Sequence, residues 1–194
     1  MINPQFRVET VLGPIHDPEL QRQCWEGYDE AHGDSAELCI QDQRCYTPET
    51  FREALLDPEY IKHVLFDKDG RVAGMVGGTN NLEKARVAYV NPNVLRRRHP
   101  DACAAGTLWY MPILFVRNAY QGQRCADLMF EEHAAYFVAR GWMIASDYAV
   151  GKHKWFNLEF FTKLYEKAFA ARGLVRVPVT RSLGGQEYFS IEFM

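Results

Sequence analysis

Residues 116–133 read VRNAYQGQRCADLMFEEH and decide the fold. The preceding stretch, residues 107–116, reads TLWYMPILFV, and its aromatic and branched side chains are typical of a buried β-strand. After it comes a polar turn at Gly122, and then an amphipathic helix with apolar positions at Cys125, Leu128, Met129, Tyr136 and Phe137. Backbone N–H groups at a helix start lack internal acceptors and form the positive end of the helix dipole. This order of elements therefore predicts a site that binds phosphate groups.

The turn resembles the pyrophosphate loop of the GCN5-related N-acetyltransferases, whose pattern is V-x-x-x-x-[Q/R]-x-x-G-x-[G/A]. The residues that fit or close the pattern are Val116, Gln121, Gly122, Gln123, Cys125 and Ala126. Arg124 departs from it, because it stands where the family has a glycine that lets the backbone approach the pyrophosphate. The Arg124 side chain either turns outward and contacts phosphate, or narrows the site and weakens coenzyme A binding; we favour the first.

A second stretch, residues 157–174, reads NLEFFTKLYEKAFAARGL and resembles the family's helix after its fifth strand, with the pattern N-x(7)-Y-E-K. Asn157 and Tyr165 match this pattern, and in a helix they lie only about 80° apart around the axis. The resemblance implies that Asn157 hydrogen-bonds the pantetheine arm and that Tyr165 protonates the departing thiolate. A tyrosine on an amphipathic helix without this motif would instead be read as a core residue.

Local signals along the chain predict one strand, two helices, three strands, a helix, a strand, a helix and two strands. The strands are expected at residues 6–12, 63–68, 71–78, 107–116, 142–150, 174–182 and 187–194. Asp17 and Pro18 open the first helix, which should end near Gly33, and Thr47 opens the second, within residues 47–60. The strongest hairpin signal is Asp69-Gly70.

This order of elements predicts an α/β (α+β) fold with a mixed sheet. It is the order found in the acyl-CoA N-acyltransferase fold of the resembled family. In that fold the fourth and fifth strands splay apart, and pantetheine pairs with the backbone of the fourth. By analogy the pairing groups here would come from Ile113, Phe115 and Val116, with Pro112 favouring a bulge.

One domain is expected over residues 1–194, with residues 80–106 as an insertion before the fourth strand. This insertion begins a short helix that runs through Arg96–Arg98 and breaks at Pro100. It is either a wall or lid on the acceptor side or a structural or dimer-contact excursion, and a homodimer is therefore allowed. The arginine run either contacts the 3′-phosphate of coenzyme A or an acidic acceptor, or, as is usual, forms a solvated helix face.

Composition excludes several classes. The formal net charge is −3, which argues against a nucleic acid or an anionic membrane held by bulk electrostatics. The five cysteines never form C-x-x-C, so neither a disulfide framework nor a zinc site is indicated, and no metal is expected. No secretory signal or long apolar stretch occurs, and we expect a cytoplasmic protein.

The resemblance implies an acyl-CoA-dependent N-acyltransferase that moves an acetyl group from acetyl-CoA to a small-molecule or peptide amine. Asp147 is our first choice for the general base, and Glu131, Glu132 and His153 are alternatives. Two other functions stay open. One is an acyltransferase that takes its acyl group from a carrier protein and makes an N-acyl amino acid or an acyl lactone. The other is a non-catalytic module that binds acyl-CoA.

Overall fold

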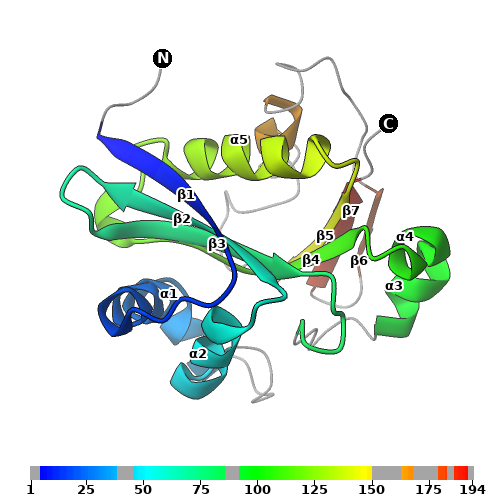
Figure 1. Ribbon diagram of the computed structural model, residues 1–194, viewed down its shortest axis with the longest axis horizontal. Helices are drawn as coiled ribbons and strands as arrows, with labels where there is room; N and C mark the ends of the chain where they lie inside the picture. The colour runs from blue at the N-terminus through cyan, green and yellow to red at the C-terminus, as the bar shows by residue number, and fades with distance from the viewer. Residues whose placement is uncertain are drawn as a thin grey trace. The chain divides into compact units, whose positions relative to one another are not determined.

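The computed structural model describes residues 5–38, 46–85, 92–149, 163–167, 179–182 and 186–191 (Figure 1). The contacts between residues divide the chain into two compact units. One unit is Met1–Gly78 with Ile113–Met129, and the other is Thr79–Pro112 with Phe130–Met194. The boundaries fall inside two strands and one helix, so these three elements contribute residues to both units.

The described strands are hydrogen-bonded in the order β1-β2-β3-β4-β5-β7-β6. They are β1 (Phe6–Leu12), β2 (Tyr60–Asp67), β3 (Val72–Thr79), β4 (Leu108–Val116), β5 (Met143–Ala149), β6 (Val179–Ser182) and β7 (Gln186–Ile191). β4 and β5 are parallel, whereas β1–β2, β5–β7 and β6–β7 are antiparallel. The predicted mixed sheet and its order of elements are therefore confirmed. The segment expected as the last helix is described only at residues 163–167, which are helical.

In the first unit, α1 (Pro18–Leu38) and α2 (Pro48–Leu56) lie side by side against one face of β1, β2 and β3 (Figure 1). Aromatic rings fill the layer between helices and sheet. The Tyr28 ring, for example, packs against the rings of both Tyr46 and Phe51. The side chains of Ile113 and Phe115, from the second half of β4, are buried in this same core. The first unit therefore fixes one face of the β4 segment that leads into the predicted phosphate loop.

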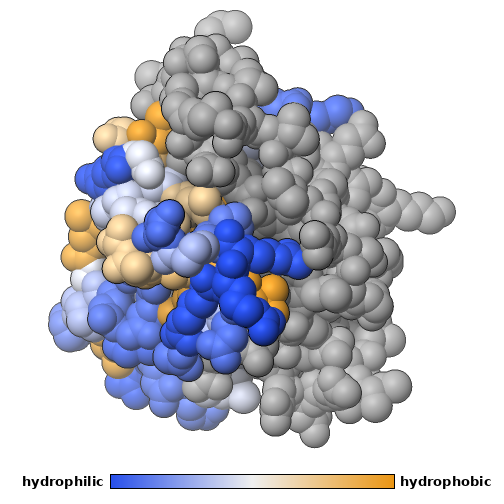
Figure 2. Space-filling model, turned by 90° about the vertical axis from the view of Figure 1, so that its right-hand side faces the viewer, coloured by the Kyte–Doolittle hydropathy of each residue, from blue (hydrophilic) through white to orange (hydrophobic). Residues whose placement is uncertain are grey.

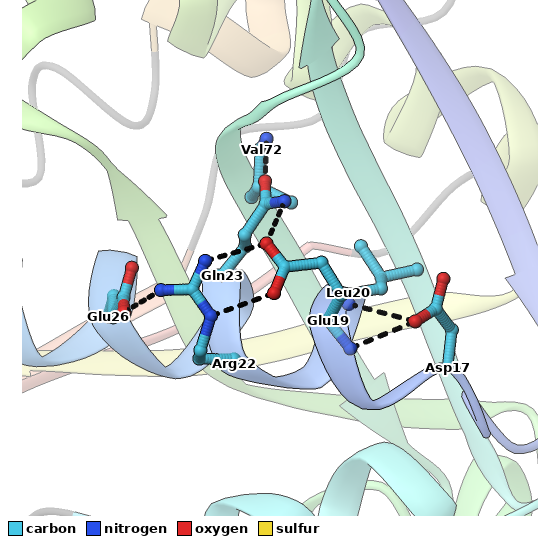
Figure 3. Close-up of polar contacts among 7 residues, drawn as sticks. All are labelled: Asp17, Glu19, Leu20, Arg22, Gln23, Glu26 and Val72. Atoms are coloured by element: carbon cyan, nitrogen blue, oxygen red, sulfur yellow. Dashed lines mark hydrogen bonds and ion pairs between the residues drawn. The ribbon is translucent and has the colours of Figure 1, made fainter.

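The start of α1 is fixed by local and long-range bonds (Figure 3). Asp17 Oδ1 accepts the Glu19 N–H at 2.9 Å, as expected for the residue that caps this helix. One turn later, Gln23 Oε1 accepts the Val72 N–H at 2.9 Å and so ties the helix to β3.

The end of α1 was predicted wrongly, because the helix continues past Gly33 to Leu38. A glycine inside a helix costs about 1 kcal/mol. One residue earlier, however, a tertiary contact holds the helix, since His32 Nε2 donates to the Leu114 carbonyl at 2.8 Å.

In the second unit, β4 pairs with β5 only through Leu108, Trp109 and Tyr110. Beyond Ala145, β5 continues to pair with β7, and no further pair between β4 and β5 is found in their described residues. The parallel strands therefore separate after three residues, as the splayed fourth and fifth strands of the predicted fold require. Pro112, which lacks an N–H, follows two residues after the last pair.

The segment predicted as an insertion contributes to the core of the second unit. It includes α3 (Pro92–Arg98) and α4 (Pro100–Ala104), and the break at Pro100 is confirmed, although the second short helix was missed. One buried cluster joins it to β4 and β5 through Leu82, Ala85, Leu95, Leu108, Tyr110, Met143 and Ala145. Figure 2 faces the side on which Figure 1 draws α3 and α4, and hydrophilic residues cover much of the described surface there.

The predicted hairpin at Asp69-Gly70 is present, and a second one lies near the end of the chain. Gly70 has a φ of +80°, the left-handed conformation that its turn requires. The terminal hairpin forms between β6 and β7, and β7 is the strand that pairs with β5.

Replacing Gly27 tests how closely α1 packs on β4. A Cβ at this position would lie 2.4 Å from the buried Phe115 ring. We expect Gly27→Ala to lower the free energy of unfolding by about 1 to 3 kcal/mol, despite the helix propensity gained. Gly33→Ala on the same helix is the control, since its Cβ would meet only the Asp29 carboxylate at 3.3 Å, and we expect a gain of up to about 1 kcal/mol. Urea denaturation of both variants measures the difference, and equal effects would contradict this packing.

Candidate active site

The second half of β4 has two different edges. Arg117 N–H donates to the Ala73 carbonyl at 2.9 Å, and a Cβ on Gly74 would lie only 2.7 Å from the Phe115 carbonyl oxygen. Backbone groups of alternate residues point to opposite sides of a strand, so those of Phe115 face β3. The backbone groups of Leu114 and Val116 therefore face the other edge.

One carbonyl on that other edge is held by α1. His32 Nε2 lies 2.8 Å from the Leu114 oxygen, and because a carbonyl only accepts, this nitrogen carries the proton. The His32 ring also packs against Tyr28, with 4.6 Å between ring centroids. The position of Leu114 is thus fixed by a ring that is itself held by the core.

A short 3-10 helix, η1 (Asn118–Tyr120), connects β4 to the loop and is bonded to α1. Glu30 accepts the Asn118 N–H at 2.7 Å through Oε1 and the Arg117 Nε–H at 3.0 Å through Oε2. Both side chains of the ion pair are 27% exposed, so the interaction is partly shielded from water. Glu30 therefore fixes the first turn after the strand.

The other end of η1 is bonded to β2. The Tyr120 hydroxyl donates to Asp67 Oδ2 at 2.7 Å, and its ring packs edge-on against Phe6. Burial alone would raise the pKa of Asp67, but hydrogen bonds from Tyr120, Arg71 and Asp69 outweigh it and lower the pKa. Burial and the bond to Asp67 raise the pKa of Tyr120, so this pair remains a neutral phenol on a carboxylate.

The predicted phosphate loop, residues 121–124, follows η1 and is exposed. The side chains of Gln121 and Gln123 turn back, and they donate to Asn118 Oδ1 at 2.7 Å and to the Ala119 carbonyl at 2.9 Å. Gly122 has a φ of +76°, and a Cβ there would meet nothing within 4 Å. The glycine is thus needed for its backbone conformation and not for space.

Arg124 has the backbone conformation of the glycine that it replaces, with a φ of +64°. Its carbonyl accepts the Leu128 N–H at 3.1 Å, so it caps the start of α5 (Cys125–Val138). Its Nε donates to Asp127 Oδ2 at 2.9 Å, and its side chain is 61% exposed. The guanidinium lies outside the turn. A residue with a left-handed backbone directly before a helix directs successive N–H groups toward one point, as in known anion-binding sites.

Cys125 and Ala126 form the first turn of α5. Their N–H groups have no acceptor inside the helix, as at any helix start. The Cys125 side chain is buried, and burial raises the pKa of its thiol to about 11. Cys125 therefore contributes its backbone to the site and not a reactive thiolate.

Tyr165 belongs to the second unit and is almost completely buried there. Its hydroxyl donates to Met111 Sδ at 4.0 Å, and its ring packs edge-on against Phe130. Burial raises its pKa well above the ordinary value. The carbonyl of the same Met111 accepts the Ser146 hydroxyl at 2.8 Å. Tyr165 thus lies at Met111, directly after the last pair between β4 and β5.

The other residues expected in the site are placed less completely. Asp147 lies on β5 opposite Tyr188 of β7, and its side chain is outside the described part of the structure. Asn157 and His153 lie outside the described residues. Glu131 and Glu132 are both exposed on α5, and Glu131 lies 4.0 Å from Lys167.

Two carboxylates that hold η1 were missed in the sequence. Glu30 and Asp67 bond partners that are 87 and 53 positions away in the chain, and no local motif contains them. The only signal was their type, since each is an acidic side chain.

In the described part of the chain, no group of three or more metal-ligating side chains comes together. Within the same residues, every helix is too short or too polar to cross a membrane.

No protein-family model matches the sequence, and no curated protein matches it. Solved structures do match along nearly the whole chain. The GNAT domain of S. lividans PAT has a TM-score of 0.58 at 11% identity, covering 96% of this chain and 90% of that one. The ribosomal-protein-S18-alanine N-acetyltransferase of Escherichia coli has a TM-score of 0.55 at 10% identity, covering 96% of this chain and 93% of that one. Spermidine/spermine N-acetyltransferase SpeG of Vibrio cholerae has a TM-score of 0.52 at 12% identity, covering 99% of this chain and 95% of that one.

These likenesses define the class of fold. The chain has the fold of the GCN5-related N-acetyltransferases, as its two motifs predicted.

Arg124→Gly tests the conformation of the loop. A left-handed non-glycine residue costs about 1 to 2 kcal/mol, and the lost ion pair is exposed and weak. Because glycine also adds entropy to the unfolded chain, we expect a net gain of at most about 1 kcal/mol in the free energy of unfolding. Gly122→Ala should instead lose about 1 kcal/mol through backbone strain alone. Thermal or urea unfolding measures both, and a clear loss with Arg124→Gly would contradict this conformation.

Proposed function

We propose that this protein is an acyl-CoA-dependent N-acyltransferase, and specifically an N-acetyltransferase that uses acetyl-CoA and an amine. The observation that carries the proposal is the loop at residues 121–124, where Gly122 and Arg124 both have left-handed backbones directly before α5. The fold supports it but does not by itself determine an activity.

The donor's pyrophosphate binds to backbone N–H groups of the loop and of the first turn of α5. Gln121, Gly122 and Gln123 form the turn, and Cys125 and Ala126 supply the helix start. Both glutamine side chains bond back to the η1 segment, and the Gln121 and Gln123 N–H groups donate to the Asn118 and Tyr120 carbonyls. The backbone donors proposed for the anion are therefore the Gly122 N–H and the start of α5. Arg124 adds a charge-assisted contact by exchanging Asp127 for phosphate.

The pantetheine arm pairs with β4 along the edge that faces away from β3. Val116 offers its N–H and carbonyl there, whereas the carbonyl of Leu114 is already bonded to His32. Of the three residues expected to pair, Ile113 and Phe115 have backbone groups on the β3 side, so this assignment leaves the pairing to Val116. Asn157 is retained as a further hydrogen-bond partner of the arm.

The reaction is a direct attack of a neutral amine on the thioester in a ternary complex. The C–N bond forms, the tetrahedral oxyanion collapses, and the C–S bond breaks to release the thiolate of coenzyme A. Tyr165 gives its proton toward the leaving sulfur. In the structure its O–H donates to another sulfur atom, that of the Met111 thioether. Asp147 accepts the proton of the amine, directly or through water, with Glu131, Glu132 and His153 as the other candidates.

The acceptor is an amine on a small molecule or a peptide. The proteins of similar fold include enzymes described as acting on spermidine or on the alanine of a ribosomal protein, which supports an amine but not a particular one. We place the reaction in the cytoplasm.

Coenzyme A should stabilise the folded protein. At a ligand concentration one hundred times the dissociation constant we expect a gain of about 2.7 kcal/mol, seen as a rise in Tm. Gln121→Ala combined with Gly122→Val should abolish the rise, because the second change obstructs the loop amides. No shift at millimolar acetyl-CoA would contradict the proposal. Turnover with a carrier-bound acyl donor alone would indicate the carrier-dependent enzyme, and tight binding without any turnover would indicate a binding module.

Tyr165→Phe separates catalysis from packing, because it removes only the hydroxyl. A general-acid role predicts a kcat lower by about 10² or more, with little change in Tm or in acyl-CoA affinity. A thioester with a better leaving group should lose less. Steady-state kinetics with two donors measures this, and unchanged turnover would remove Tyr165 from the site.

A further inference from the structure

We propose that Glu30 and Asp67 are positioning residues that hold the phosphate loop in its binding conformation by fixing the two ends of η1. This inference rests on the proposed function, because the ligand it concerns is coenzyme A. Neither residue is expected to touch the donor. Each acts through a loop residue, Glu30 through Arg117 and Asn118, and Asp67 through Tyr120.

The contacts of Glu30 show why it restrains the loop. It uses both oxygens, one on a backbone N–H and one on a guanidinium, so it fixes the main chain as well as a side chain. Charge-assisted bonds of this kind are about twice as strong as neutral ones. Because Arg117 neutralises Glu30, the carboxylate adds little repulsion toward an incoming anion.

Asp67 restrains the other end of η1. Its Oδ1 accepts the N–H groups of Asp69 and Arg71 in the β2–β3 turn, at 2.9 and 2.8 Å, which leaves Oδ2 for Tyr120. Asp67 is only 8% exposed, so its orientation is set by the hairpin and not by solvent. The Tyr120 hydroxyl is therefore bonded to a rigid acceptor one residue before the loop begins.

These two anchors leave residues 121–124 as a short bridge between a fixed η1 and α5. Ordering such a bridge in advance lowers the entropy lost when a ligand binds to its amides. Loss of either anchor should therefore weaken the binding of coenzyme A through a more mobile loop, without removal of any group that contacts it.

The experiment compares Glu30→Gln, Glu30→Ala and Tyr120→Phe with the wild-type chain. Glu30→Gln keeps an acceptor for the Asn118 N–H but loses the ion pair, whereas Glu30→Ala loses both. Glu26→Ala is the matched control, since Glu26 is one turn earlier on α1 and pairs only with Arg22 among the contacts drawn in Figure 3. Two quantities are measured: the Kd of coenzyme A by calorimetry and the hydrogen exchange of amides 118–126 without ligand.

We expect the Kd to rise about tenfold in Glu30→Ala and Tyr120→Phe and less in Glu30→Gln, with faster exchange at amides 118–126 in the same order. The inference would be overturned if the Kd of Glu30→Ala and Tyr120→Phe lay within about twofold of the Kd of Glu26→Ala. It would also be overturned if their Kd rose without faster exchange at amides 118–126. If the wild-type chain does not bind coenzyme A, the proposed function fails. The exchange data then still decide whether the two carboxylates restrain the loop.

Discussion

The packing of α1 against β4 is the constraint on which the candidate site depends. Gly27 allows the helix to approach the Phe115 ring, Glu30 binds the turn after the strand, and His32 holds the Leu114 carbonyl. These three contacts come from less than two turns of one helix. Because α1 is itself fixed to β3 through Gln23, both the edge of β4 and the start of the phosphate loop are positioned by the core of the first unit.

The sequence predicted the elements whose signals are local. Asp69-Gly70 fixes its hairpin, and Asp17 with Pro18 fixes the start of α1, because a few adjacent residues determine each conformation. The end of α1 was not predictable from local signals, since the bond that holds the helix directly before Gly33 goes to β4, far along the chain. The bonds of Glu30 and Asp67 escaped detection for the same reason. Pro100 was read as a helix break, but proline also favours the first helical position and so begins α4.

At Arg124 the loop keeps the backbone conformation expected of the family's glycine but carries a different side chain. The glycine expected there supplies a left-handed φ, and Arg124 adopts that φ. We expected its side chain either to reach phosphate or to narrow the turn, and it instead pairs with Asp127. Such an exposed pair is worth at most about 1 kcal/mol, whereas a hydrogen bond to a charged phosphate contributes about 1.5 to 3 kcal/mol. For the proposed binding of pyrophosphate, exchange of the carboxylate for phosphate is therefore the expected direction.

The burial of Tyr165 restricts the chemistry that it can perform. A phenol with a raised pKa is a weaker acid than a thiol, whose ordinary pKa is about 8.5. Full transfer of its proton to an isolated thiolate would therefore be unfavourable. In the proposed reaction, however, the attacking amine becomes a cationic nitrogen that must lose a proton after it joins the acyl group. Tyr165 then acts best as a hydrogen-bond donor while negative charge develops on sulfur, and any proton it gives must be replaced from that nitrogen. This coupling makes the base that accepts the amine proton as important to the release of the thiolate as Tyr165 itself.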